Sequence, residues 1–327
     1  MPRRFIRELR ERENIDDVFL ASDKQLRANR QGNLYLQVEL SDRSGSISTR
    51  IWNATKELAS RFNDGDFVRA RGATQLFQGG LQLIASDIDR AEPGEVDETD
   101  FLVLTSDRID RMAIRLAEIL RGIENPHLAG LVECYLADET FMQKFTSSPA
   151  GVKLHHAYRG GLLEHVLNLC EVILAIAPRY PRIDRDLLLV GAFLHDSGKV
   201  QELTTERGLA YTDSGQLVGH IVLGAGLLDR KAAEAEQLGG EPVPTELVTR
   251  IKHMIVSHHG SNEFGSPAVP MTLEAIALHY LDSLDAKVVS FEQLIRDDGN
   301  LDGNWTQYYP GLGRKLFKAG QLESNHE

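Results

Sequence analysis

The chain has 327 residues, 42% of them hydrophobic, which suits two globular domains and excludes disordered and fibrous proteins. Its net charge of −12 argues against a protein that coats nucleic acid through bulk electrostatics. No apolar run is expected to reach the roughly 18 residues of a membrane span, and the charged N-terminus lacks the apolar region of a signal peptide. We therefore expect a cytoplasmic protein without a membrane partner.

The first part of the chain alternates apolar and polar residues between turn residues, a pattern typical of a small antiparallel sheet. A short helix is expected at Thr55–Arg61, between the third and fourth strands. Five strands with a helix in that place predict an all-β OB-fold barrel, which we assign to residues 1–91. The expected strands are Val18–Ala28, Asn33–Leu40, Ser46–Trp52, Asp66–Phe77 and Leu81–Ile88.

The same alternation predicts which side chains of the barrel face outward. Aromatic rings among arginines on an outer face can stack bases and contact phosphates, so we predict a nucleic-acid-binding face there. The alternative is that Trp52 and Phe77 pack under a loop or against the next domain. The residues expected to face inward are Leu34, Leu36, Val38, Leu40, Ile47, Ile51, Val68, Ala70 and Leu76. The residues of the predicted binding face are Tyr35, Arg50, Trp52, Arg69, Arg71 and Phe77.

Residues 92–100 contain five acidic residues, a proline and a glycine without periodicity, and they predict a linker. Helical patterns follow it to the end of the chain, so we expect an all-α second domain over residues 101–327. Residues 1–91 hold 15 basic and 13 acidic residues, and the remainder holds 21 basic and 35 acidic residues. The acidity therefore belongs to the second domain, where part of it could serve a cation.

An almost wholly apolar stretch at residues 186–194 predicts a buried helix that ends in His195 and Asp196. Burial of a carboxylate and an imidazole is costly unless a charge partner is present, and a bound cation can satisfy both. The simpler alternative for this stretch alone is an exposed helix end with Asp196 in water.

More imidazoles and carboxylates come from four other predicted helices: His165, His220, the pair His258 and His259, and Asp282. A helical bundle builds an internal metal centre from such residues because each helix offers only one or two inward ligands. Asp196 is the expected bridge, since a carboxylate has two oxygens. One site would use His165, His195, Asp196 and Asp282, and a second would use Asp196, His220, His258 and His259.

The donors of this predicted centre are nitrogen and oxygen atoms without a thiolate, which disfavours Mg²⁺ alone. They permit one or two ions of Mn²⁺, Fe, Co²⁺, Ni²⁺ or Zn²⁺, with Mn²⁺ as the first choice. The alternative is a set of core and surface histidines, each satisfied by the protein. That alternative fits single histidines better than it fits the whole set.

The order His165, His195-Asp196, His220, His258-His259 and Asp282 resembles the HD-domain metal-dependent phosphohydrolase superfamily. The segment His195-Asp196-Ser197-Gly198-Lys199 is similar to the His-Asp-x-Gly-Lys core of that superfamily. With the stretches HHAYRGGLLEH and HYLDSLDAK and the preceding OB domain, the chain resembles the YhaM family of bacterial 3′-to-5′ exoribonucleases. The resemblance implies hydrolysis of single-stranded RNA by a metal-activated water, with single-stranded DNA and homo-oligomer formation left open.

Three residues near the predicted centre are candidates for contacts with substrate. Lys199 is expected to stabilise charge on phosphorus, with a surface lysine after a helix cap as the alternative. Arg159, beside the Gly160-Gly161 turn, is expected to hold a phosphate, and His156 could do likewise or act on the leaving oxygen. A plain turn is the alternative for both.

A cluster of aromatic and basic residues near the C-terminus, which includes Trp305, Tyr308 and Arg314, has two interpretations, contact with the terminal nucleotide or core packing. Two other functions also remain open. An HD enzyme could hydrolyse nucleotides or cyclic dinucleotides under regulation by the OB domain. A non-catalytic nucleic-acid-binding protein could hold its metal for structure alone.

Overall fold

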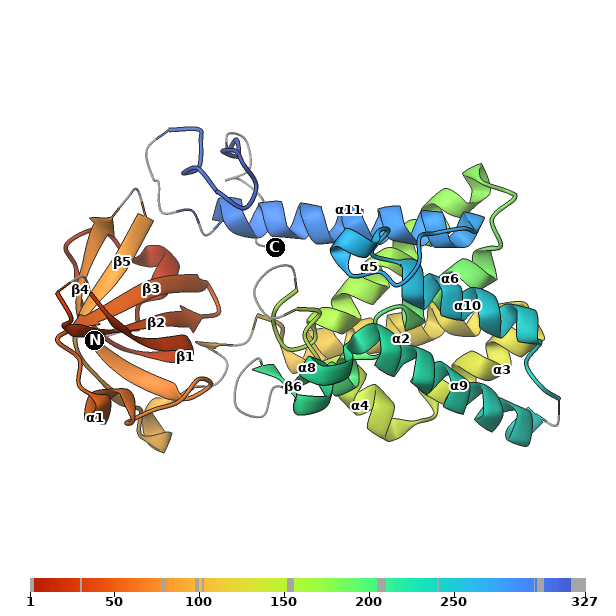
Figure 1. Ribbon diagram of the computed structural model, residues 1–327, viewed down its shortest axis with the longest axis horizontal. Helices are drawn as coiled ribbons and strands as arrows, with labels where there is room; N and C mark the ends of the chain where they lie inside the picture. The colour runs from red at the N-terminus through yellow and green to blue at the C-terminus, as the bar shows by residue number, and fades with distance from the viewer. Residues whose placement is uncertain are drawn as a thin grey trace. The chain divides into compact units, whose positions relative to one another are not determined.

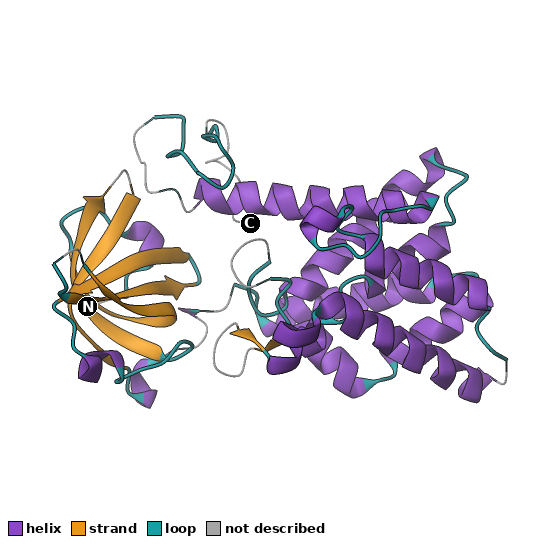
Figure 2. Cartoon of the chain, in the orientation of Figure 1, coloured by secondary structure: helices purple, strands orange, loops and turns teal. Residues whose placement is uncertain are grey.

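The computed structural model describes residues 3–318 except for residues 30, 78–79, 98–99, 102, 152–155, 205–209, 240, 297 and 299–302. The chain forms two compact units. One unit contains the residues up to Val103 together with those from Phe291 onward, and the other contains most of the chain between Leu104 and Ser290 (Figure 1). Figure 2 shows the barrel strands in the first unit and most of the helices in the second.

The N-terminal part of the first unit is a closed five-stranded barrel with the strand order β1-β2-β3-β5-β4. A short helix, α1 (Lys56–Ala59), lies between β3 and β4 as expected, and the prediction of an OB-fold is confirmed. Two 3-10 turns flank the strands, Ile6–Glu8 before β1 and Pro93–Glu95 after β5. The strands are β1 (Asn14–Ala28), β2 (Leu34–Asp42), β3 (Gly45–Trp52), β4 (Phe67–Phe77) and β5 (Gly80–Arg90).

The alternation of side chains holds along most of the barrel. The core of the barrel includes Leu36, Val38, Leu40, Ile47, Ile51, Val68 and Ala70. The prediction fails at Leu76, which is 50% exposed. Thr74, two residues earlier on the same face of β4, is buried, so the alternation itself continues; Leu76 is exposed because it is one of the last three residues of the strand, all of which are exposed. The Thr74 hydroxyl accepts a hydrogen bond from the backbone N–H of Glu13 (2.9 Å), which compensates its burial.

The second unit is helical, as predicted, apart from a two-stranded ladder of two-residue strands, β6 (Leu203–Thr204) and β7 (Ala210–Tyr211). Its shorter elements are α7 (Lys199–Glu202), α8 (Asp213–Val218) and the 3-10 turns Ala177–Arg179 and Asn262–Phe264. Its longer helices are α2 (Ser106–Arg121), α3 (Pro126–Leu136), α4 (Glu139–Ser147), α5 (Gly161–Ile176), α6 (Arg185–Leu194), α9 (His220–Gly239), α10 (Thr245–Ser257) and α11 (Leu273–Arg296). The last residues of α11, from Phe291, belong to the first unit.

Helix α6 lies in the core of the helical unit, and the side chains from Asp186 to Leu194 are all buried. Asp184 caps its N-terminus by accepting a hydrogen bond from the backbone N–H of Leu187 (3.0 Å). Two glycines let neighbouring segments approach closely. A Cβ at Gly191 would overlap the side chain of Met254 on α10, and a Cβ at Gly198 would overlap the carbonyl of His220 at the start of α9. These approaches bring α9 and α10 to the end of α6.

One segment of the helical unit, Gly161–Arg179, has the length and mean hydropathy (1.5) of a membrane span, so the expectation that no run reaches this length is wrong. Half of the 18-residue stretch with this mean hydropathy is buried within the protein. The segment also carries His165, whose buried ring lies 2.7 Å from the Asp285 carboxylate. These features fit a core helix, and length and composition alone are weak evidence for a membrane span.

Candidate metal centre

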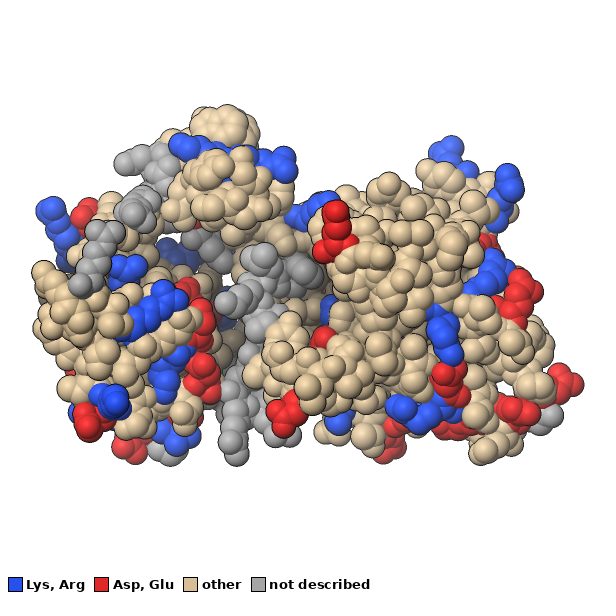
Figure 3. All heavy atoms as spheres, in the orientation of Figure 1, with Lys and Arg blue, Asp and Glu red and all other residues tan. Residues whose placement is uncertain are grey.

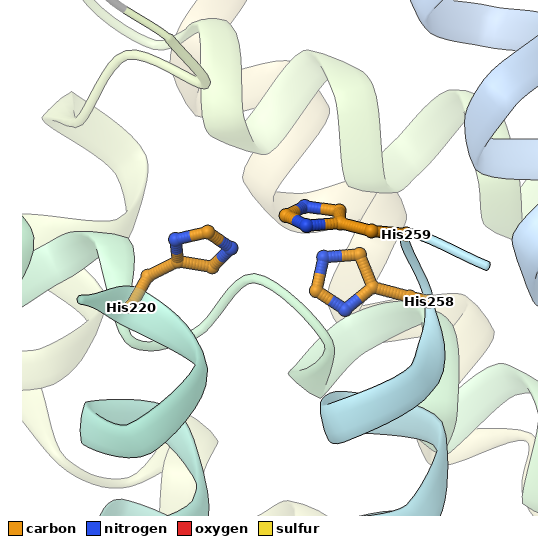
Figure 4. Close-up of side chains that lie close together, drawn as sticks. All are labelled: His220, His258 and His259. Carbon is orange, nitrogen blue, oxygen red and sulfur yellow. The ribbon is translucent and has the colours of Figure 1, made fainter. Parts of the chain in front are cut away.

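The predicted metal ligands lie together where five helical segments of the second unit meet. They form two groups whose donor atoms lie within 4.8 Å of one another. The first group is His165 on α5, His195 after α6 and Asp282 on α11; the second is His220 on α9 with His258 and His259 after α10. Figure 4 shows the rings of the second group facing a shared space. Asp196 contacts both groups.

In the first group, the Nε2 atoms of His165 and His195 lie 3.3 Å apart. The Nε2 of His165 is 3.3 Å from Asp282 Oδ1, and the Nε2 of His195 is 3.3 Å from Asp196 Oδ2. A cation about 2.1 Å from each of its ligands separates neighbouring donors by roughly 3 to 3.5 Å. The spacing of these four donors therefore fits a single ion.

In the second group, the other oxygen of Asp196 faces the histidines. Asp196 Oδ1 lies 3.5 Å from His220 Nε2 and 3.7 Å from His258 Nε2. The ring of His259 is 4.1 Å from that of His258, centroid to centroid. The two oxygens of Asp196 thus point to different groups, which is the arrangement of a bridging carboxylate.

In four of these histidines a hydrogen bond at Nδ1, the ring nitrogen that points away from the shared space, fixes the orientation of the ring. His195 and His258 place Nδ1 2.8 Å from the carbonyl oxygens of Ala192 and Ile255. A carbonyl can only accept, so both Nδ1 atoms carry the proton and both Nε2 atoms present a lone pair. Asp285 (2.7 Å) holds Nδ1 of His165, and Glu202 (3.1 Å) holds Nδ1 of His220 in the same way. Such backing is typical of histidines that ligate metals.

Several buried polar atoms of the centre have no hydrogen-bond partner among the described residues. They are Asp196 Oδ1, His220 Nε2, His258 Nε2 and His259 Nδ1. Each unsatisfied buried group costs about 1–3 kcal/mol, and more when it is charged. Four such atoms around one space would be a large penalty in a protein without a ligand there. A divalent cation fits this set because all four can donate a lone pair to it.

The ionisation of the centre follows from its mixed charges. Burial opposes ionisation of Asp196, but Lys199 and His195 outweigh burial and hold the pKa of Asp196 well below its usual value. Burial also opposes protonation of His165, yet Asp282 and Asp285 raise its pKa to about 9. Burial lowers the pKa of His258 well below its usual value, so its ring is neutral. A bound cation would take the place of the proton on His165.

Lys199 is mostly buried, so the interpretation as a surface lysine is wrong. Its Nζ donates to Asp196 Oδ2 (2.6 Å) and to the carbonyl of Ala150 (2.6 Å). The ammonium group thus lies against the carboxylate that joins the two groups of donors. Its positive charge compensates that of the Asp196 carboxylate.

His156 is buried and has a positive φ of 54°, an uncommon backbone conformation for a residue other than glycine. Its Nε2 lies 2.9 Å from Asp285 Oδ2, and its Nδ1 lies 3.0 Å from the hydroxyl of Tyr158. Tyr158 in turn donates to Glu164. Both ring nitrogens of His156 are therefore engaged within the protein. Arg159, by contrast, is exposed just before the N-terminus of α5.

Two carboxylates of the centre, Asp285 and Glu202, are not among the site residues expected from the sequence. Asp285 Oδ2 contacts His165 and His156, while its Oδ1 accepts a hydrogen bond from Asn168 (3.1 Å). The available signal for Asp285 was its position three residues after Asp282, because residues i and i+3 share a helix face. Glu202 lies three residues after Lys199 in the same way.

Substitution Asp285→Ala is expected to lower metal affinity by about 10-fold to 100-fold, because the ring of His165 would lose the acceptor that fixes its orientation. Isothermal titration of the metal-free protein with Mn²⁺ measures this change. Glu292→Ala, an exposed carboxylate on the same helix, is the control and should bind as the parent does. Equal Mn²⁺ affinity for Asp285→Ala and the parent would exclude an orienting role.

The predicted binding face of the barrel divides into two groups. Tyr35 and Trp52 pair across β2 and β3 with ring centroids 5.3 Å apart. The Arg50 guanidinium lies 5.2 Å from the ring of Phe77, and its Nε is buried without a hydrogen-bond partner among the described residues. Trp52 and Phe77 are 46% and 45% exposed, so packing of these rings under a loop is wrong for the described residues. This first group keeps the aromatic and cationic character of a stacking surface.

The second group of the barrel face, Arg69 and Arg71, is engaged in ion pairs. Both arginines contact the carboxylate of Asp16 (2.6 and 3.2 Å), and Arg69 also pairs with Glu95. These carboxylates lower the charge available to a phosphate. Figure 3 shows basic and acidic side chains mixed on the visible face of the barrel.

Family models match both parts of the chain. Residues 22–90 match the OB-fold nucleic acid binding domain, and residues 162–287 match the HD domain. The second match contains the candidate ligands from His165 to Asp282. Two solved structures align with parts of the chain. A replication protein A domain from Methanococcus maripaludis is 27% identical, covers 27% of this chain and 94% of its own, and has a TM-score of 0.22. The HD domain of L. monocytogenes phosphodiesterase PgpH is 18% identical, covers 46% of this chain and 74% of its own, and has a TM-score of 0.27, so both alignments are too weak to support a conclusion.

Three curated proteins named 3′-5′ exoribonuclease YhaM are similar to this chain over most of its length. The protein from Geobacillus sp. (strain WCH70) is 35% identical over 84% of this chain and 83% of its own. The Bacillus velezensis protein is 33% identical over 86% of this chain and 88% of its own. The Oceanobacillus iheyensis protein is 32% identical over 96% of each chain. Because these identities extend through most of each relative, the chain belongs to the YhaM family.

Proposed function

We propose that this chain is a metal-dependent 3′-to-5′ exoribonuclease that degrades single-stranded RNA. One observation carries the catalytic part of the proposal, namely that two groups of candidate metal ligands lie against the two oxygens of Asp196. The names of the relatives support the substrate and the direction of cleavage. In this proposal residues 1–91 bind nucleic acid, residues 92–100 form a linker, residues 101–327 contain the helical domain that carries catalysis, and the enzyme works in the cytoplasm.

The proposed ligands of one ion are His165, His195, Asp282 and Oδ2 of Asp196, and those of the other are His220, His258, His259 and Oδ1 of Asp196. A donor set of imidazoles and carboxylates without a thiolate suits Mn²⁺, our first choice, and also Fe, Co²⁺, Ni²⁺ or Zn²⁺. When bound, the ions would polarise the phosphodiester and lower the pKa of water so that it can attack at neutral pH.

The other residues would bind and orient the substrate. Lys199 lies against Asp196, where its ammonium group can stabilise charge on a phosphate. Arg159, exposed before α5, would hold a substrate phosphate. His156 would act through Asp285, which it shares with His165, because both its nitrogens are engaged in the protein. Tyr35, Arg50, Trp52 and Phe77 would stack the single strand, and Arg69 and Arg71 would add phosphate contacts once freed from Asp16.

The test of this function is cleavage of one RNA sequence carrying a label at either end. With Mn²⁺, 5′-labelled RNA should shorten stepwise, and 3′-labelled RNA should release its label as a single nucleotide at once. EDTA should stop both reactions. Cleavage at internal positions would contradict an exonuclease. Inert RNA together with hydrolysis of a cyclic dinucleotide would favour the nucleotide phosphodiesterase instead.

Substitution Trp52→Ala is expected to weaken single-strand binding by about five-fold to a hundred-fold, since stacking on one aromatic ring contributes about 1–3 kcal/mol per base. Fluorescence anisotropy of a labelled oligonucleotide in EDTA measures this loss. Hydrolysis of bis-p-nitrophenyl phosphate, which is too small to reach across a binding face, should stay unchanged. Equal oligonucleotide affinity for Trp52→Ala and the parent would show that the barrel face does not grip the strand.

A further inference from the structure

The first unit contains a second structured surface besides the barrel, a hairpin that we define as residues 303–318. Its two arms are joined by backbone bridges between Trp305 and Phe317 and between Tyr309 and Arg314. The backbone N–H of Thr306 donates to the carbonyl of Leu316 (2.9 Å). Thr306 and Leu316 are buried, so the hairpin has an inner side that fixes its fold.

The outer side of the hairpin carries large aromatic rings. Trp305, Tyr308 and Phe317 are 53%, 56% and 51% exposed. The rings of Trp305 and Phe317 meet edge to face with centroids 5.0 Å apart. The interpretation that this cluster is core packing is therefore wrong. Exposed aromatic rings gathered at one place usually mark a binding surface.

The charge of the hairpin is opposite to that of the chain. Residues 303–318 contain three basic residues and no acidic residue, in a chain with a net charge of −12. Arg314 and Lys315 are exposed, and Lys318 pairs with Asp298 outside the hairpin (3.1 Å). Figure 3 shows blue Lys and Arg atoms among tan atoms on its visible side. A polyanion complements such a surface, whereas an acidic or an uncharged apolar partner would leave either the rings or the cations unused.

The hairpin also lies next to the stacking surface of the barrel, within the same compact unit. A Cβ built at Gly80, where β5 begins, would lie 3.7 Å from the side-chain oxygen of Gln307. Phe77, at the end of β4, pairs across the strands with Gly80 and holds the guanidinium of Arg50 near its ring. The hairpin therefore continues the surface that Arg50 and Phe77 begin.

We propose that the hairpin is a second binding surface for single-stranded RNA, on which bases stack against Trp305, Tyr308 and Phe317 while Arg314 and Lys315 contact phosphates. The identity of the strand as RNA rests on the proposed function. The hairpin lengthens the path over which one strand is held. Loss of the hairpin should therefore weaken the binding of long strands more than the binding of strands of a few nucleotides.

The chain offers a direct measurement, because it contains two tryptophans, Trp52 on the barrel and Trp305 on the hairpin. In the full-length Trp52→Phe variant, Trp305 is the sole indole fluorophore. Titration of this variant with an unstructured oligoribonucleotide in EDTA should quench the fluorescence of Trp305 to saturation, since a stacked base quenches an indole. A duplex of the same length is the control and should quench much less.

Affinity variants test the contribution of the hairpin. Trp305→Ala should weaken binding of the oligoribonucleotide by about five-fold to a hundred-fold, while Trp305→Phe should retain most of the affinity. Lys315→Gln keeps every ring and should flatten the salt dependence of binding by about one phosphate contact. Tyr180→Ala, which removes a 55% exposed ring in the helical unit, is the matched control and should bind as the parent does.

Two results would overturn the hairpin proposal. One is unquenched Trp305 in the Trp52→Phe variant at oligonucleotide concentrations that saturate the anisotropy signal. The other is parent-like affinity in a folded Trp305→Ala variant together with a parent-like salt dependence in Lys315→Gln. Failure of the proposed function would look different, because the oligoribonucleotide would bind and quench without being degraded on addition of Mn²⁺.

Discussion

Substitution Asp196→Ala is expected to abolish hydrolysis and to release the metal from both proposed sites. Its two oxygens face different groups of donors, with Oδ2 3.3 Å from His195 and Oδ1 3.5 Å from His220. Loss of the bridge removes one ligand from each ion and the negative charge between them. We expect a fall in kcat of at least about 10³-fold, which corresponds to about 4 kcal/mol of transition-state stabilisation. Elemental analysis of the purified variant should find little metal.

The fold of the Asp196→Ala variant should survive, because the side chain makes few contacts that hold the helices together. Its Oδ1 has no hydrogen-bond partner among the described residues, and its Oδ2 pairs with Lys199. Circular dichroism in EDTA should give similar spectra for the variant and the parent. Parent-like metal content and activity in the variant would exclude the proposed sites.

A second buried carboxylate, Asp186 near the start of α6, provides a matched control, since Asp196 follows the end of the same helix. Asp186 accepts hydrogen bonds from the backbone N–H groups of Glu124 (2.7 Å) and Asn125 (3.0 Å) and pairs with Arg185. Asp186→Ala should therefore lower the melting temperature while leaving the number of metal ions per chain unchanged. The two variants separate a carboxylate that supports the fold from one that binds metal.

The residue types of the candidate centre could be predicted because each ligand is chemically conspicuous on its own helix. An apolar helix that ends in His195 and Asp196 already demands a partner for buried charge. Asp285 and Glu202 could not be predicted, because a carboxylate on a helix is usually in water and only the packed structure shows which imidazole it reaches. The sequence therefore predicted the candidate ligands and missed the carboxylates that contact the Nδ1 atoms of His165 and His220.

In the barrel, local alternation predicted the strands but could not predict their neighbours. β4 pairs with β1, about 50 residues earlier in the chain, and this pairing brings Asp16 opposite Arg71 and beside Arg69. Leu76 is one of the last three residues of β4, all of them exposed, and alternation does not show where a strand leaves the barrel core. Both departures depend on what surrounds the strand in the folded barrel, which the alternation of one strand does not encode.

Substitution Lys199→Ala is expected to lower kcat by about 10²-fold or more if its ammonium group stabilises charge that develops on phosphorus. Lys199 Nζ lies 2.6 Å from Asp196 Oδ2, so it also compensates the carboxylate that would bind metal. These two roles give different results. A role at the transition state lowers kcat with little change in KM or metal content, whereas a role in charge compensation changes the affinity for Mn²⁺.

The measurement is steady-state hydrolysis of bis-p-nitrophenyl phosphate at saturating Mn²⁺, with Mn²⁺ binding followed by calorimetry on the same preparations. Lys199→Arg keeps a positive charge but replaces the compact ammonium group with a planar guanidinium, so it should restore Mn²⁺ affinity better than it restores kcat. A change confined to KM would assign Lys199 to ground-state binding of substrate. A parent-like kcat in Lys199→Ala would show that its ion pair with Asp196 has no part in the reaction.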